Sequence, residues 1–175
     1  EAVRYLRGEQ INPRLHAVNM ALCEQLVING GLAKDNADAK AQLEQALYSG
    51  KAAEYFARMV VEQGGPADFV DNYAHYFAVA PVVKPLFAPH NGILNAMNTR
   101  NIGIAVIGLG GGRRVATDEI DLRVGFDQVL PLGTSVDTQT PLTVIHAKDE
   151  ASWNQAAQAF LNAITINEQA YQSTP

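Results

Sequence analysis

Residues 107–114, Ile-Gly-Leu-Gly-Gly-Gly-Arg-Arg, have the composition of a loop that could bind phosphate. A dinucleotide-binding loop needs the spacing Gly-x-Gly-x-x-Gly between a strand and a helix. Gly108 and Gly110 match the first two positions, but Arg113 stands where the third glycine belongs. The residues after Arg114 lack a helical spacing of apolar side chains, so no helix N-terminus follows that could hold a phosphate. A nucleotide-binding loop is therefore the less favoured interpretation of these glycines.

The favoured interpretation is structural: a helix over 99–109, with Thr99 as its N-cap, that ends in the glycines. A buried strand is an alternative for the same apolar run. Gly103 and Gly108 would each cost the helix about 1 kcal/mol relative to alanine, so we expect another backbone to pack closely against them. We expect positive φ angles over 110–112. Arg113 and Arg114 are then expected to bond the last helix carbonyls or a carboxylate.

Residues 146–150, His-Ala-Lys-Asp-Glu, have the composition of a catalytic cluster. In a strand, His146 and Lys148 share one face and Ala147 and Asp149 the other. A nucleophile would have to lie close to His146, and the local sequence offers none. Asp149 is explained more simply as the N-cap of the following helix. We therefore expect structural or surface roles here.

The remaining candidates for metal or thiol chemistry are isolated. His16, His75 and His90 lack a histidine four residues away, and a single cysteine cannot complete a structural zinc site. Cys23 lies in an apolar helical run and is expected to be a small buried hydrophobe. A lone thiol fits a reducing, cytoplasmic setting. We predict no catalytic, substrate-binding, cofactor-binding or metal-binding residue and no cofactor.

The elements that would position these residues change in character near residue 80. Residues 1–80 are expected to be a helical segment, with helices over 14–29, 36–48 and 51–63 separated by glycine-containing breaks. The apolar face of the first of these helices is broad, which predicts burial on more than one side. An aromatic run over 72–77 is expected to pack between elements.

Residues 81–175 are expected to form a mixed C-terminal domain. Pro85 in an apolar run indicates an edge strand or a bent strand. Residues 92–98 alternate like a strand, and residues 141–147 are expected to be a central strand. An amphipathic helix over 150–166 closes the chain, with Trp153, Phe160 and Ile164 on its inner face. The predicted class is α/β, with an α+β, barrel-like C-terminal end.

The barrel-like pattern raises an alternative function, a stand-alone carrier module of the biotinyl or lipoyl type. Such carriers display a lysine at a tight hairpin tip. The only lysines after residue 80 are Lys84, which precedes a proline, and Lys148, which precedes a helix cap. A net charge of -5 without a basic patch argues against nucleic acid or an anionic membrane as a partner. No stretch approaches the ~20 apolar residues of a membrane span.

Long segments resemble one family in order and spacing. They are residues 8–27 (GEQINPRLHAVNMALCEQLV), 50–70 (GKAAEYFARMVVEQGGPADFV), 110–114 (GGGRR), 118–126 (DEIDLRVGF) and 141–150 (PLTVIHAKDE). All resemble the C-terminal portion of the bacterial thymidine phosphorylases, within the pyrimidine nucleoside phosphorylase family. Because the chain opens on Glu1 without a methionine, we expect it to be a piece of a longer protein.

The resemblance implies a homodimeric enzyme that reversibly converts thymidine and phosphate to thymine and 2-deoxyribose 1-phosphate. In that family, a Lys-His-Ser-Thr-Gly-Gly loop holds phosphate between a small helical and a large α/β domain, and this loop is absent from the sequence. The resemblance therefore places the catalytic groups in an N-terminal remainder of the same enzyme. The 175-residue segment alone is expected to be inactive scaffold.

Overall fold

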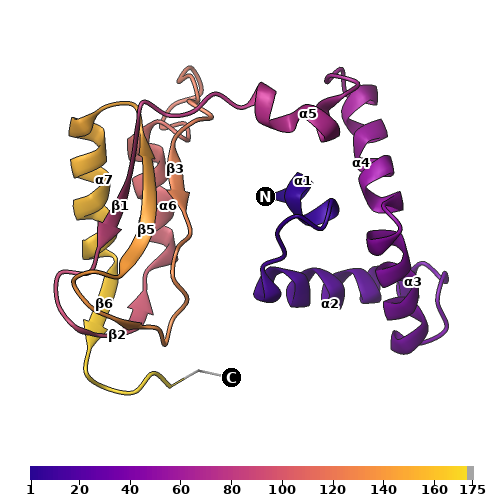
Figure 1. The fold of residues 1–175 in the computed structure, drawn as a ribbon, viewed down its shortest axis with the longest axis horizontal. Helices are drawn as coiled ribbons and strands as arrows, with labels where there is room; N and C mark the ends of the chain where they lie inside the picture. Colours follow the sequence, from indigo (N-terminus) through magenta and orange to yellow (C-terminus); the bar gives the residue numbers. More distant parts are fainter. Residues whose placement is uncertain (173–175) are drawn as a thin grey trace. The chain divides into compact units, whose positions relative to one another are not determined.

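A computed structural model describes residues 1–172 of the chain as two compact units (Figure 1). The first unit spans Glu1–Phe77 and is entirely helical, and the second begins at Ala78 and combines helices with strands. The division falls close to the change in composition near residue 80. Within the described part of the chain, none of the helices has the length and apolar character needed to cross a bilayer.

Five helices make up the first unit, and most of them follow from local signals. Asn12 accepts backbone N–H bonds at the start of the second helix, and Asp35 does so at the start of the third. The helices predicted over 14–29, 36–48 and 51–63 are thereby confirmed to within a residue or two at each end. The five are α1 (Ala2–Leu6), α2 (Pro13–Asn29), α3 (Asn36–Tyr48), α4 (Lys51–Glu62) and α5 (Phe69–Tyr76).

Two features of this helical unit differ from expectation. The apolar face of α2 was expected to be buried on more than one side, yet no residue of α2 is buried. No separate helix was predicted for the aromatic run over 72–77, but most of it lies in α5, where Asn72 departs from helical dihedral angles. Local periodicity missed α5 because that helix is short and interrupted.

The second unit is built on two separate three-stranded antiparallel sheets. One sheet has the order β1-β5-β3 and the other has the order β4-β2-β6. The predicted central position of β5 and the predicted edge position of β1, the strand that contains Pro85, are both confirmed. The strands are β1 (Val82–Phe87), β2 (Gly92–Met97), β3 (Gly125–Asp127), β4 (Ser135–Val136), β5 (Pro141–Ala147) and β6 (Ile164–Asn167).

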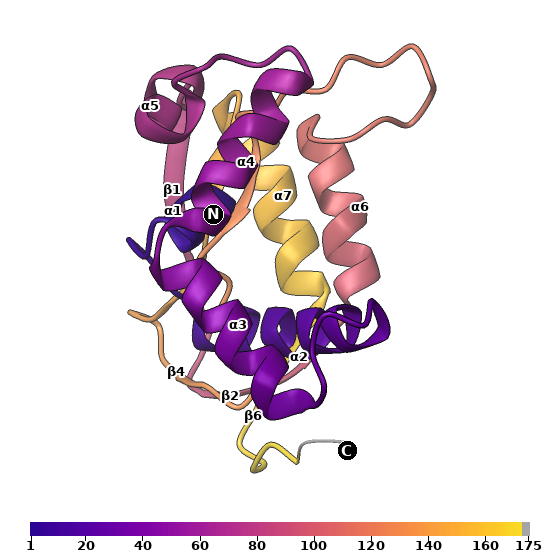
Figure 2. The same ribbon diagram turned by 90° about the vertical axis from the view of Figure 1, so that its right-hand side faces the viewer.

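Two helices, α6 (Thr99–Leu109) and α7 (Glu150–Asn162), lie side by side and pack against the β5 sheet (Figure 2). Between the helices and the sheet is the apolar core of this unit. Phe160 and Ile145 are fully buried at its centre, and the ring of Phe160 lies 5.2 Å from that of Phe126. The core also includes Leu86, Leu109, Val136, Leu142, Ala147, Ala156 and Ala157.

Three expectations for this unit need correction. The sheets do not close into a barrel within residues 78–172, because β1-β5-β3 and β4-β2-β6 share no strand. The closing helix ends at Asn162 instead of residue 166, since Ile164 pairs with Met97 of β2 and so begins β6. The N-cap of α6 is Asn98, one residue before Thr99, and its side chain accepts from the N–H of Asn101. The mixed helix-and-strand class itself is confirmed.

The core geometry predicts a large effect of truncating Phe160. Phe160→Ala should lower the free energy of unfolding of the second unit by about 3–5 kcal/mol, because a cavity is left where no side chain can collapse fully. Trp153 is the only tryptophan of the chain and packs against this core, so its fluorescence during urea unfolding reports on this unit. Leu122→Ala, at a side chain that is 85% exposed, is the matched control. Equal effects of the two substitutions would contradict the assignment of the core.

Candidate functional site

The glycine-rich segment lies at the C-terminal end of α6. Gly110 adopts a left-handed conformation (φ 101°) and its N–H donates to the carbonyl of Ile107, while the N–H of Gly111 donates to Val106. These bonds satisfy carbonyl groups at the negative end of the helix dipole, which disfavours a bound phosphate. The structural interpretation of this segment is confirmed, and the nucleotide-binding alternative loses its geometric basis.

Two details of that interpretation are wrong. No atom outside the backbone of α6 lies within 4 Å of the position that a Cβ on Gly103 would take, and only the Arg114 side chain, at 3.9 Å, approaches that of Gly108. No second backbone therefore explains these glycines within residues 1–172. Positive φ is also confined to Gly110 and does not extend over 111–112.

The loop that follows is held by two aspartates. Asp118 accepts from the backbone N–H groups of Arg114 (2.9 Å) and Val115 (3.2 Å), while the Arg113 side chain donates to the Asp118 carbonyl. Asp121 makes two hydrogen bonds of 2.8 Å with the Arg123 guanidinium, and these bonds lower the pKa of Asp121 to about 2. Both arginine–aspartate arrangements order the loop and leave no pair of groups poised for proton transfer.

Residues 146–150 are divided between the end of β5, the short connection after it and the start of α7. Ala147 is fully buried, His146 is half-buried on the opposite face of the strand, and no hydrogen bond to the His146 ring exists among the described residues. The Asp149 carboxylate accepts from the Ser152 hydroxyl at 2.6 Å and from the Ser152 N–H at 2.7 Å in a capping box, and these bonds lower the pKa of Asp149. The prediction of a cap is confirmed, and no nucleophile–base pair is formed.

The other histidines and the cysteine also lie apart from one another. The Tyr5 hydroxyl and His16 Nδ1 share a hydrogen bond of 2.8 Å, and burial raises the pKa of Tyr5. His75 contacts Tyr76 edge-on, and His90 bonds the carbonyl of the next residue. Cys23 is half-buried, where a buried side chain was expected. Among residues 1–172, no three His, Cys, Asp or Glu side chains are grouped so that they could hold a metal ion.

The two lysines that bear on the carrier alternative are not at hairpin tips. Lys84 lies in the middle of β1, opposite Ile145, and forms an ion pair with Glu150 of α7. Lys148 is exposed in the connection between β5 and α7. A carrier needs a free lysine on a tight turn of a closed barrel, and the described residues provide neither feature.

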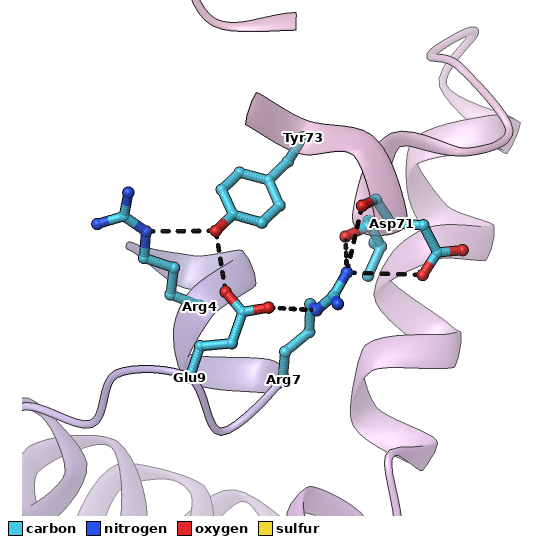
Figure 3. Close-up of polar contacts among 6 residues, drawn as sticks. Arg4, Arg7, Glu9, Asp71 and Tyr73 are labelled. Carbon is cyan, nitrogen blue, oxygen red and sulfur yellow. Dashed lines mark hydrogen bonds and ion pairs between the residues drawn. The ribbon is translucent and has the colours of Figure 1, made fainter. Parts of the chain in front are cut away.

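A network of polar side chains in the helical unit was missed by sequence reasoning (Figure 3). Tyr73 of α5 donates to Glu9 (2.9 Å) and accepts from Arg4, and Glu9 also pairs with Arg7 at 2.7 Å. Arg7 in turn donates to the Val70 carbonyl. The network joins residues in and just after α1 to residues of α5. The bonded residues are more than 60 positions apart in the sequence, so no local pattern could reveal the network. Its charged side chains pair with other members of the network, which suits a structural role.

Comparison with known families assigns the second unit. Residues 93–167 match the family model of the pyrimidine nucleoside phosphorylase C-terminal domain. The match covers 75 of the 175 residues, all of them in the second unit. The match begins inside β2 and ends with the last residue of β6, so it includes both helices that cover the β5 sheet. The resemblance noted from sequence motifs is therefore confirmed at the level of the pyrimidine nucleoside phosphorylases.

The family match covers only part of the chain. Within the matched residues, the glycine cap of α6 and the capping box of α7 stabilise the ends of their helices. Strand β1 and the five helices of the first unit lie outside the matched residues.

Substitutions of a glycine inside α6 and of the glycine at its C-cap should change the free energy of unfolding in opposite directions. Gly103→Ala should raise the free energy of unfolding by about 1 kcal/mol, because the residue is exposed within a helix and has free space around it. Gly110→Ala should lower it by about 1 kcal/mol or more, since alanine is strained at a φ of 101°. Urea unfolding followed by Trp153 fluorescence measures both. Destabilisation by Gly103→Ala would show that another element packs on that face of α6.

The Asp121–Arg123 pair leads to a pH dependence of stability. Because the folded pKa of Asp121, about 2, lies below its ordinary value of 3.8, its stabilisation is complete above about pH 5 and is lost as pH falls toward 2. The difference in Tm between the wild type and Asp121→Asn should therefore be largest near neutral pH and shrink below pH 4. Scanning calorimetry from pH 2.5 to pH 7 tests this.

The control for this pH series is Glu119→Gln. Glu119 is exposed in the same loop and takes part in no hydrogen bond or ion pair within the described part of the chain. Its substitution should change the Tm at pH 7 by less than Asp121→Asn does. A difference between wild type and Asp121→Asn that stays constant down to pH 2.5 would contradict the role given to the ion pair.

Proposed function

We propose that this chain is the C-terminal part of a thymidine phosphorylase, a pentosyltransferase of pyrimidine nucleoside salvage. The enzyme reversibly converts thymidine and phosphate to thymine and 2-deoxy-α-D-ribose 1-phosphate. The observation that carries the proposal is the match of residues 93–167 to the C-terminal domain of the family. The choice of thymidine rests on the resemblance of residues 8–27, 50–70 and 110–150 to the thymidine-specific branch.

The chemistry of the reaction defines what a supporting segment contributes. The N-glycosidic bond breaks and a bond from C1 of the sugar to a phosphate oxygen forms, with positive charge developing on the sugar. Fixed donors and close positioning of phosphate supply most of the rate enhancement. Water must be kept out, because it would compete with phosphate for the sugar carbon. A supporting segment therefore has to be rigid rather than reactive.

The second unit has the rigidity that this role requires. Its central strand is hydrogen-bonded on both edges, and Ile145 and Ala147 of that strand and Phe160 of α7 are fully buried. The Lys-His-Ser-Thr-Gly-Gly loop that the resemblance implies for phosphate binding is absent from the sequence. The groups that act on thymidine and phosphate are accordingly assigned to an N-terminal remainder of the enzyme. The assembled enzyme is proposed to be a cytoplasmic homodimer that needs no cofactor.

The decisive experiment compares the 175-residue chain with the full-length enzyme that contains it. We expect phosphate-dependent release of thymine from thymidine by the full-length enzyme and none above background by the chain alone, because the phosphate-binding loop is missing. Thymine is quantified by chromatography, with and without phosphate. A folded chain is verified in parallel by the cooperative change in Trp153 fluorescence during urea unfolding.

The same assay separates the enzyme from the alternatives. Phosphate-dependent turnover by the chain alone would overturn its role as scaffold. A full-length enzyme that cleaves uridine with a higher kcat/KM than thymidine would overturn the choice of substrate while leaving the family assignment intact. The intact mass of the chain should equal that of the unmodified sequence, whereas a covalent addition on Lys84 or Lys148 would favour a carrier.

A further inference from the structure

Two helices of the first unit, α2 and α4, have no buried residue. Helix α2 has 17 residues and α4 has 12, and neither contributes to a core in the described chain. On α2, Val18, Leu22 and Leu26 are 49%, 62% and 70% exposed. On α4, Tyr55 and Met59 are 56% and 46% exposed. Helices of this length depend on tertiary burial for most of their stability, so these exposed faces lack a partner.

A hollow of about 570 Å³ adjoins these exposed side chains inside the helical unit. Its walls come from α1, α2, α3 and α4 and are mainly apolar, with Leu15, Met20, Leu43, Leu47 and Phe56 among them. At 100° per residue, Leu15 lies between Leu22 and Leu26 on the helical wheel of α2, and Phe56 lies beside Met59 on that of α4. The hollow and the exposed stripes therefore form one continuous apolar face.

The position of the first residue indicates what covers this face. Glu1 and Ala2 line the hollow, and in Figure 1 the N-terminus lies inside the arc formed by α2, α3, α4 and α5. Polypeptide that precedes Glu1 in the full-length enzyme would thus start at the hollow itself. An apolar segment reaching this surface through the same chain needs no loss of translational freedom, unlike a separate molecule.

We propose that the polypeptide preceding Glu1 in the full-length enzyme packs into this hollow and over the stripe of Val18, Leu22 and Leu26. The inference rests on the proposed function, because that function supplies the N-terminal remainder. It goes further in naming the surface on which the remainder folds. The helical unit would then complete its core only together with the preceding chain, so that the part carrying the catalytic groups is held directly by α2 and α4.

The first test introduces a charge on the stripe in the full-length enzyme. Leu22→Lys should lower the apparent Tm by about 4 °C or more, because a lysine would be forced into an apolar contact. Leu122→Lys is the matched control: it makes the same change at a leucine of the second unit that is 85% exposed. It should shift the Tm by less than about 2 °C. Equal shifts for the two variants would overturn the proposal.

The second test uses Cys23, which lines the hollow and is half-buried in the described chain. N-ethylmaleimide should modify Cys23 at least about tenfold more slowly in the full-length enzyme than in the 175-residue chain, with the site of labelling read by peptide mass spectrometry. Equal rates would overturn the proposal. This comparison uses no substitution, so a variant that fails to fold cannot affect it.

Two further outcomes separate this proposal from its competitors. If the 175-residue chain sediments as a dimer that Leu22→Lys dissociates, a second copy covers the face and the proposal is wrong. Thymidine phosphorolysis by the wild-type full-length enzyme is measured independently. Activity together with a neutral Leu22→Lys variant would refute the docking surface alone, whereas absence of activity would refute the proposed function.

Discussion

The second unit depends on the burial of one strand, β5. Its backbone pairs with β1 on one edge and with β3 on the other, so its polar groups are satisfied away from water. Ile145 and Ala147, on the face toward α7, are fully buried, as is Phe160 of that helix. The chain must then turn within two residues from strand to helix, and the Asp149–Ser152 capping box secures that turn. Strand and helix are thereby fixed to each other by local hydrogen bonds as well as by the core.

Where local chemistry determines an element, the sequence was sufficient to predict it. Asp35 and Asp149 mark helix starts because their carboxylates accept backbone N–H groups three residues on, and β5 reads as a central strand because it is almost continuously apolar. The end of α7 was missed for the opposite reason. Apolar residues keep their helical spacing as far as Ile164, but that residue pairs with Met97, which lies far away in the sequence. A non-local strand pairing outweighed the local pattern.

The candidate sites show the same division. The role of the glycines was predictable because an anion site requires a helix to begin after them, and the sequence after Arg114 has no helical pattern. The polar network of Arg4, Arg7, Glu9 and Tyr73 was not predictable, because α5 itself was missed and the bonded residues are far apart in the sequence. Gly103 remains without a structural reason within the described residues, which shows that a costly residue type is only weak evidence for a close contact.

The two units also differ in how completely they bury their apolar side chains. The second unit has a closed core in which two helices and a sheet cover one another. In the helical unit, the buried hydrophobic side chains are only Val3, Tyr5, Ala39, Leu47 and Val70, and α2 and α4 contribute none of them. A short helix gains little from its own hydrogen bonds, so such a unit is marginal until another surface covers it. The second unit therefore buries a core made of its own residues, whereas α2 and α4 leave their apolar side chains exposed.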